Sequence, residues 1–206
     1  MIAILDYGVG NLYSLTCSLK ALGAETAVTK DPALIRQADR LLLPGVGAFG
    51  DAAQKLRQQG LDLLIKERVA AGVPLLGICL GMQLLFEKSY EFGEHEGLGL
   101  IPGTVRPISE VIPPDLKIPH IGWNGLEILK DSPIFKYVRS GDMVYFVHSY
   151  YGTGCGDSLI ATAEYGVPLT AAVAGGRVYG VQFHPEKSGP VGLNILKAFA
   201  EENGVC

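Results

Sequence analysis

Short apolar runs alternate with segments of helical periodicity through the first ninety residues of the chain. The apolar runs predict strands, and the segments between them, whose apolar positions recur every three or four residues, predict helices. The predicted strands are 2–6, 24–29, 40–44 and 73–79, and the predicted helices are 12–23, 32–38, 52–72 and 80–88. This alternation predicts an α/β fold with a parallel sheet that helices cover on both faces.

The ends of the predicted helices carry residues that commonly start or stop a helix. Asn11 can cap the start of the first helix, and Asp31 followed by Pro32 can do the same for the second. Gly23 and Gly72 stand where glycines commonly end helices. We therefore expect the helices to begin and end close to these positions.

The pattern changes after about residue 97, where glycines and prolines become frequent and strand-like runs follow one another. The runs 143–151 (MVYFVHSYY) and 158–166 (SLIATAEYG) predict an antiparallel extension of the sheet. Gly175 and Gly176 separate two further strand-like runs and predict a two-residue hairpin turn, because both positions tolerate positive φ. A final helix is predicted over 192–204, and no linker interrupts the chain, so we expect a single domain over residues 1–206.

Composition narrows the class of protein. Of the 206 residues, 48% are hydrophobic and 18% charged, and the formal net charge is −4. These values argue against a basic nucleic-acid-binding surface and against a disordered acidic chain. The expected partner is a small molecule or another protein.

The cysteines and the N-terminus indicate the compartment. Cysteines 17, 79, 155 and 206 are far apart and form no CxxC pair, which favours neither a zinc site nor a disulfide framework. The N-terminus lacks the pattern of a signal peptide, and the longest apolar run, 73–86, is too short to span a bilayer. We expect a soluble cytoplasmic protein.

One cysteine stands where a strand is predicted to turn into a helix. Cys79 is the centre of residues 77–81 (GICLG), which have the form of a nucleophile elbow with cysteine in place of serine. Glycines at the flanking positions remove the collisions that side chains would make at so sharp a turn. The helix N-terminus favours the thiolate and offers backbone N–H groups to a reacting oxygen. The alternative is a buried structural cysteine beside ordinary turn glycines.

A nucleophilic cysteine needs a base, and the histidines of the chain are at positions 95, 120, 148 and 184. His184 follows an apolar strand-like run and precedes Pro185 and Glu186. In an extended segment His184 and Glu186 project to the same side. The carboxylate can then hold the imidazole in the tautomer whose other nitrogen faces the thiol. Taken alone, this tripeptide could equally be a loop histidine beside a solvated glutamate.

The glycine-rich loop 44–50 (PGVGAFG) follows the third predicted strand and has the form G-x-G-x-x-G. A dinucleotide site is disfavoured, because the motif does not follow the first strand and no acidic residue ends a next strand about 20 residues later. We favour a flexible turn whose backbone N–H groups point at the negative charge that develops beside Cys79.

These motifs together carry a resemblance to a known family. Residues 77–83 (GICLGMQ), the PGVG loop at 44–47 and His184-Pro185-Glu186 resemble the class I, or triad, glutamine amidotransferases. Three further stretches resemble, more narrowly, the members of that class that work with a (β/α)8-barrel cyclase in histidine biosynthesis; they are 6–15 (DYGVGNLYSL), 118–124 (IPHIGWN) and 145–151 (YFVHSYY). The resemblance covers essentially the whole chain. It implies a three-layer α/β sandwich with a mostly parallel central sheet extended by antiparallel strands.

The resemblance also implies an activity and a set of site residues. The chain would hydrolyse glutamine to glutamate and ammonia without a cofactor or metal, and would pass the ammonia to the cyclase subunit of a heterodimer. Cys79 would be the nucleophile, His184 the general base and acid, and Glu186 the residue that orients the imidazole. The other implied residues are Val46, Gly47 and Leu80 for the oxyanion hole, Gly45, Gln83, His148, Ser149 and Tyr150 for glutamine binding, and Asn11 and Trp123 for the partner interface. Core packing is the alternative for Trp123, and His120 could serve the core or the interface.

Other functions stay open at this point. A glutaminase subunit could serve a different synthase, and a stand-alone cysteine hydrolase of γ-glutamyl compounds or peptides would use the same triad. A non-catalytic binding subunit with a decayed site is disfavoured, because Cys79, His184 and Glu186 are all present.

Overall fold

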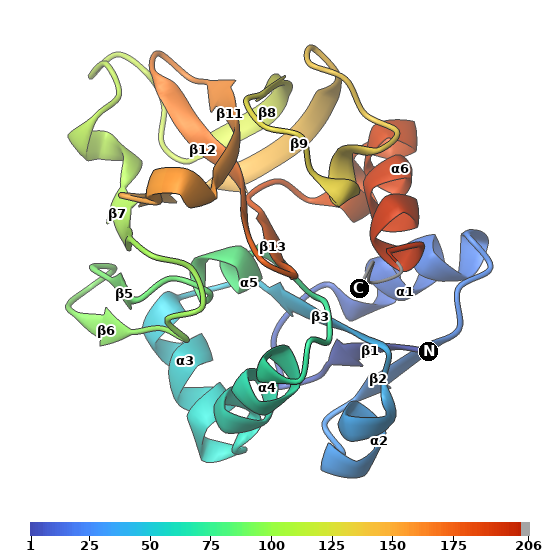
Figure 1. The fold of residues 1–206 in the computed structure, drawn as a ribbon. Coiled ribbons are helices and arrows are strands. Elements are labelled where there is room, and N and C mark those ends of the chain that lie inside the picture. The colour runs from blue at the N-terminus through green and yellow to red at the C-terminus, as the bar shows by residue number, and fades with distance from the viewer. Residues whose placement is uncertain (203–206) are drawn as a thin grey trace.

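The computed structural model describes residues 1–202 and shows a nine-stranded mixed sheet with helices on both faces (Figure 1). In spatial order the strands are β2 (Thr26–Thr29), β1 (Ile2–Leu5), β3 (Arg40–Gly45), β4 (Leu75–Cys79), β13 (Val178–Val181), β12 (Pro168–Gly175), β11 (Leu159–Glu164), β8 (His120–Ile128) and β9 (Met143–His148). Neighbours from β2 to β13 are parallel, and neighbours from β13 to β9 are antiparallel. The predicted α/β fold with an antiparallel extension is confirmed.

The helices form the outer layers because residues of each buried strand alternate between two apolar clusters. In β1, Ile2 and Ile4 face one cluster, and Ala3 and Leu5 face the other. Helices α1 (Leu12–Ala21) and α6 (Gly189–Ala200) contribute to the first cluster, and α2 (Pro32–Gln37), α3 (Phe49–Gln58) and α4 (Leu61–Ala70) to the second. No helix within residues 1–202 combines the length and the apolar character needed to cross a bilayer.

A second, four-stranded sheet was not predicted. Its order is β10 (Tyr150–Thr153), β7 (Thr104–Pro107), β5 (Lys88–Ser89) and β6 (His95–Glu96), and β6 packs against α3 (Figure 1). The predicted strand 143–151 is therefore two strands, because β9 ends at His148 in the large sheet and β10 begins at Tyr150 in the small one. Short 3-10 helices lie at Ile108–Glu110, Pro133–Phe135, Gly156–Ser158 and Pro185–Lys187.

Two of the predicted helices were wrong in extent. The segment 52–72 divides into α3 and α4, because Gly60 adopts a left-handed φ of 67° that ends the first helix and starts the second. The segment 80–88 forms only the single turn α5 (Leu80–Gln83). Beyond it, the carbonyls of Leu84 and Leu85 accept hydrogen bonds from the N–H groups of residues 98, 100 and 101 instead of continuing a helix.

Smaller differences concern the C-terminal part of the chain. The hairpin turn lies one residue later than predicted, because Gly175 still pairs with Val178 and the turn is Gly176 and Arg177. Helix α6 starts at Gly189, three positions before the predicted start, and the last two residues of the predicted helix lie outside the described residues. The predicted starts of the first two helices are confirmed, since Asn11 accepts a hydrogen bond from Ser14 N and Asp31 from Ala33 N, whereas α3 starts at Phe49, three positions before its predicted start.

Candidate active site

Cys79 occupies a strained turn at the junction of β4 and α5. Its backbone has φ 54° and ψ −112°, a conformation that residues other than glycine rarely adopt. A Cβ atom on Gly77 would lie 2.6 Å from Gly81 O, and one on Gly81 would lie 1.8 Å from Leu43 O. The predicted steric need for a glycine on each side of the cysteine is confirmed. The two glycines allow the chain to turn against β3 and leave the sulfur at the end of the strand.

Gly81→Ala tests this packing. We expect the free energy of unfolding to fall by about 3 kcal/mol or more, because the carbonyl of Leu43 belongs to a central strand and cannot move away. Gly125→Ala is the control, since its Cβ would meet no atom closer than 3.4 Å. Urea unfolding of both variants measures the difference, and equal losses of stability would contradict the account.

The side chain of Cys79 lines a cavity of about 430 Å³. Most of the residues expected to serve the reaction line it: Val46, Gly47, Cys79, Leu80, Gln83, His148, Ser149, Tyr150 and His184. Gly45, Glu186, Asn11 and Trp123 do not belong to the lining. Segments from both halves of the chain therefore meet at one cavity, at the ends of β3, β4 and β9.

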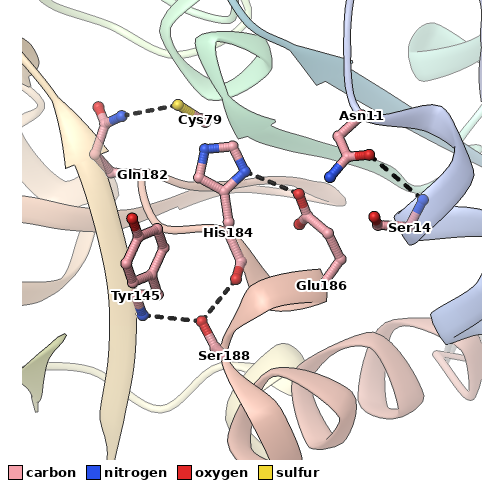
Figure 2. A network of polar contacts seen from close by, with 8 residues as sticks. All are labelled: Asn11, Ser14, Cys79, Tyr145, Gln182, His184, Glu186 and Ser188. Carbon is pink, nitrogen blue, oxygen red and sulfur yellow. Dashed lines mark hydrogen bonds and ion pairs between the residues drawn. The ribbon is translucent and has the colours of Figure 1, made fainter. Parts of the chain in front are cut away.

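The imidazole of His184 lies between Cys79 and the Glu186 carboxylate (Figure 2). His184 Nδ1 is 2.9 Å from Glu186 Oε1, and both side chains are only 3% exposed. Because Nδ1 is engaged by the carboxylate, the other ring nitrogen, Nε2, is the one that faces the sulfur. Hydrogen bonds hold the segment 184–188 against β9, since Ser188 Oγ donates to His184 O at 2.6 Å and accepts from Tyr145 N at 3.0 Å.

The surroundings of His184 favour its protonated form. Burial disfavours a charged imidazole, but the interactions with Cys79 and Glu186 outweigh it and raise the pKa of His184 to about 9. A protonated imidazole beside the sulfur is the arrangement that activates a cysteine for attack on an amide.

The glycine loop lies directly beside the elbow. Gly45, the last residue of β3, pairs with Cys79 in the sheet register. A Cβ atom on Gly45 would lie 2.8 Å from the hydroxyl of Tyr7 and 2.9 Å from Gly81 N, so only glycine fits there. Tyr7 in turn donates to Pro44 O at 2.7 Å. This packing holds the start of the loop, while Gly47, with a φ of 96°, reaches the cavity.

His148 is buried in a second polar cluster and is not positioned as the base. Its Nδ1 is 2.9 Å from Tyr150 O, and its Nε2 is 3.1 Å from Nδ1 of the buried His120. Burial lowers the pKa of His148 to about 4, against a small opposing effect of the bond to Tyr150 O. His148 is therefore neutral at pH 7. His120, whose role was left open, belongs to the interior of the protein.

Acid should destabilise the protein through His148. An unfolded histidine takes up its proton near pH 6.5, whereas His148 in the folded chain does so near pH 4. Stability is thus lost as the pH falls from 6.5 towards 4, by up to about 3 kcal/mol. Comparison of urea unfolding at pH 7.5 and pH 5 should show that His148→Gln loses about 2 kcal/mol less than the unsubstituted chain. Parallel losses in the two proteins would contradict this assignment.

The residues expected at the partner interface occupy different settings. Asn11 caps α1 through its side chain, which accepts from Ser14 N at 3.5 Å. Trp123 is 51% exposed on β8 and meets the ring of Tyr145 edge-on at 5.9 Å, so it is not a core residue. Ile118 and Ile121 are also exposed on the same segment. Ile121 and Trp123 lie two positions apart on β8 and so face the same side of the sheet, and Pro119, which precedes this strand, lines the cavity.

The cavity has further lining residues that no sequence motif indicated. Glu91, Phe92, Pro119, Val147 and Lys187 also line the cavity. The Glu91 carboxyl group accepts from Phe49 N at 2.6 Å and gives the cavity an acidic side chain. Burial raises the pKa of Glu91. It lies in an irregular acidic stretch without a motif, so no local signal separates it from its exposed neighbours.

Gln182 was also missed, although it left a signal in the sequence. It is a polar residue in the apolar run VYGVQF, two positions before His184, and it is completely buried. Its Nε2 lies 3.7 Å from Cys79 Sγ (Figure 2). Among residues 1–202, His, Cys, Asp and Glu side chains form no group of three that could hold a metal ion.

Known proteins that match this chain in sequence or in structure share its fold. The sequence family described as "Glutamine amidotransferase class-I" matches residues 3–203. The crystal structure of a glutamine amidotransferase superposes with a TM-score of 0.74 at 20% identity, covering 96% of this chain and 98% of its own. A chain of PurLQS from Thermotoga maritima superposes with a TM-score of 0.76 at 19% identity, covering 96% of both chains. The fold and the matched residues define a class I glutamine amidotransferase.

More similar relatives identify the family within that class. The imidazole glycerol phosphate synthase subunit HisH of Lactococcus lactis subsp. lactis (strain IL1403) is 52% identical over 202 residues, which are 98% of either chain. The subunit of the same name from Listeria innocua serovar 6a is 46% identical over 206 residues, covering 100% of this chain and 98% of the relative. The chain belongs to the HisH family of class I glutamine amidotransferases and is an enzyme of that kind.

Proposed function

We propose that this chain is the glutaminase subunit of an imidazole glycerol phosphate synthase, acting in the cytoplasm in histidine biosynthesis. It hydrolyses glutamine and passes the ammonia to a (β/α)8-barrel cyclase subunit in a heterodimer. The observation that carries the proposal is that Cys79 and His184 line the cavity while Glu186, behind them, binds the imidazole of His184. The family supplies the kind of substrate and partner.

The reaction begins with attack of the Cys79 thiolate on the side-chain amide carbon of glutamine. The carbonyl oxygen becomes an oxyanion, which the N–H of Leu80 at the start of α5 and a backbone N–H of the Val46–Gly47 segment stabilise. One such donor contributes about 3 to 4 kcal/mol to transition-state stabilisation in other enzymes. Gly45, Gln83, His148, Ser149 and Tyr150 form the surroundings that hold glutamine.

His184 moves the protons of both half-reactions. Its imidazolium protonates the departing nitrogen, so that ammonia leaves and a γ-glutamyl thioester remains on Cys79. The neutral imidazole then takes a proton from water, whose oxygen attacks the thioester and releases glutamate. Glu186 holds Nδ1 throughout, which keeps Nε2 directed at the reacting atoms.

A covered exit from the site is needed because ammonia in bulk water becomes ammonium and loses its nucleophilic lone pair. The exposed apolar side chains of Ile118, Ile121 and Trp123 lie close in the sequence to Pro119 of the cavity wall and are suited to a protein partner. The resemblance to the family places Asn11, at the start of α1, at the same interface. Docking at this surface would cover the cavity.

The decisive experiment compares glutamine hydrolysis by the purified chain alone, with the cyclase, and with the cyclase and its nucleotide ligand. With the cyclase and its ligand, we expect hydrolysis at least about tenfold faster than by the chain alone. The reason is that a peptide bond of the loop 45–47 has to rotate to complete the oxyanion hole, and the loss of one oxyanion donor lowers kcat by about 10²–10³-fold. Equal rates in all three would favour a stand-alone hydrolase.

A pair of surface variants tests where the cyclase binds. Trp123→Ala should weaken cyclase binding about tenfold, as expected for a large aromatic at an interface. Leu63→Ala is the control, because Leu63 is 70% exposed on α4, away from the cavity. The same loss in both variants would argue against this docking surface.

A further inference from the structure

Gln182 approaches Cys79 on the side away from Glu186 (Figure 2). It follows β13, which runs parallel to β4 and brings this part of the chain beside the elbow. The side chain is completely buried, and its Nε2 is 3.7 Å from Cys79 Sγ. Burial of an amide is costly unless its donors and acceptors are paired. The contacts of this amide therefore decide what it does.

A short chain of hydrogen bonds determines which end of the Gln182 amide faces the sulfur. Gln83 Nε2 donates to Tyr150 O at 2.9 Å and to Gln182 Oε1 at 3.0 Å. Only an NH2 group can bind both of these oxygens, so the amide of Gln83 has a single satisfactory orientation. The oxygen of Gln182 is then occupied by Gln83, and its nitrogen faces Cys79. The opposite orientation would place the NH2 groups of the two glutamines against each other.

The orientation has a chemical consequence at the sulfur. An amide nitrogen can only donate, so Cys79 Sγ has to be the acceptor. A thiolate accepts hydrogen bonds much more strongly than a thiol, and a bond to a charged acceptor is about twice as strong as a neutral one. Unlike His184, Gln182 does not titrate, so it favours the anionic sulfur at every pH at which the protein is folded.

We propose that Gln182 is a further catalytic residue, which donates a hydrogen bond to Cys79 Sγ, stabilises the thiolate and fixes the direction from which the sulfur attacks. This inference rests on the proposed function in one respect, the role of Cys79 as the nucleophile. Cys79 is then held by two donors, His184 Nε2 and Gln182 Nε2. When the sulfur becomes part of the neutral thioester, the bond from Gln182 weakens, and it strengthens again when the thiolate is released.

The test measures alkylation of Cys79 by iodoacetamide against pH, without glutamine, by mass spectrometry of the modified peptides. Gln182→Met keeps the approximate size of the side chain but removes its donor. We expect the midpoint of the alkylation profile to move about one unit to higher pH, so that the rate of alkylation at pH values below both midpoints falls about tenfold. The kcat for glutamine should fall by a similar factor, with little change in KM. Unchanged alkylation would overturn the proposal.

Two controls separate this role from a merely structural one. Cys17, an exposed cysteine on α1, is an internal standard whose alkylation profile should not change. Thr170→Val replaces another buried polar side chain by an apolar one of similar size on β12 and should leave the Cys79 profile unchanged. A shift of the same size in Thr170→Val would mean that the effect comes from general packing, and would overturn the proposal.

A second measurement serves if Gln182→Met does not fold. In the unsubstituted chain labelled with ¹⁵N-glutamine, the side-chain amide resonance of Gln182 should titrate with the same midpoint as Cys79 alkylation, and should not do so in Cys79→Ala. An amide signal that ignores the state of the sulfur would overturn the proposal. Glutaminase activity retained by Cys79→Ala would instead remove the proposed nucleophile, whatever Gln182 does.

Discussion

Replacement of Cys79 by alanine is expected to reduce the kcat for glutamine hydrolysis by about 10⁴-fold or more, because the substitution removes the atom that forms the thioester. The residual rate would come from the oxyanion donors and from substrate binding alone. Release of glutamate by the chain with its cyclase measures the effect. The backbone conformation at residue 79 is equally strained for alanine, so the comparison isolates the sulfur.

Two controls accompany the Cys79 variant. With added ammonium salts, the Cys79→Ala complex should still form the cyclase product, because the ammonia then enters without the glutaminase reaction. Cys155→Ala removes a different buried thiol, on a segment that does not line the cavity, and should keep nearly full activity. Glutamine-dependent product formation that survives in Cys79→Ala would contradict the mechanism.

The second large effect is expected for His184→Asn, which should lower kcat by about 10³-fold, within the range of 10²–10⁴ for the loss of a general acid–base. The variant loses the proton donor to the leaving nitrogen and the cation beside the sulfur. The alkylation of Cys79 at pH 7 should therefore slow as well, since the imidazolium no longer favours the thiolate. Both effects are measured with the assays described above.

His95→Asn is the matched control for His184→Asn. His95 lies on β6, is partly buried and does not line the cavity. Its replacement should change kcat by less than about threefold, as expected for a position away from the chemistry. If both histidine variants lost activity to the same extent, the assignment of His184 as acid and base would be wrong.

The parts of the fold and site that could be predicted from the sequence follow local rules. The alternation of apolar runs and helical segments identified β1 to β4, since β1, β3 and β4 are buried on both faces and the edge strand β2 is still rich in β-branched residues. The GxCxG spacing identified the turn at Cys79, because the two glycines are required by contacts within a few residues and with the neighbouring strand. The short spacing of His184 and Glu186 placed their side chains together.

The parts that could not be predicted depend on contacts between distant segments. The short length of α5 results from hydrogen bonds to residues 98–101, which supply the donors for carbonyls that a longer helix would have used. The small sheet contains strands of two residues, too short to leave a periodic pattern. Gln182 is an unusual polar residue in an apolar run, but its partner Gln83 is 99 positions away, so its contacts follow only from the adjacency of β13 and β4.

The most direct test is to identify the residue that a substrate-shaped electrophile modifies. The chain is incubated with a diazoketone analogue of glutamine, with and without excess glutamine, and its peptides are analysed by mass spectrometry. We expect one adduct per chain, on Cys79, which glutamine prevents and which forms in parallel with the loss of activity. Inactivation by an adduct at another residue, or full activity after Cys79 is modified, would contradict it.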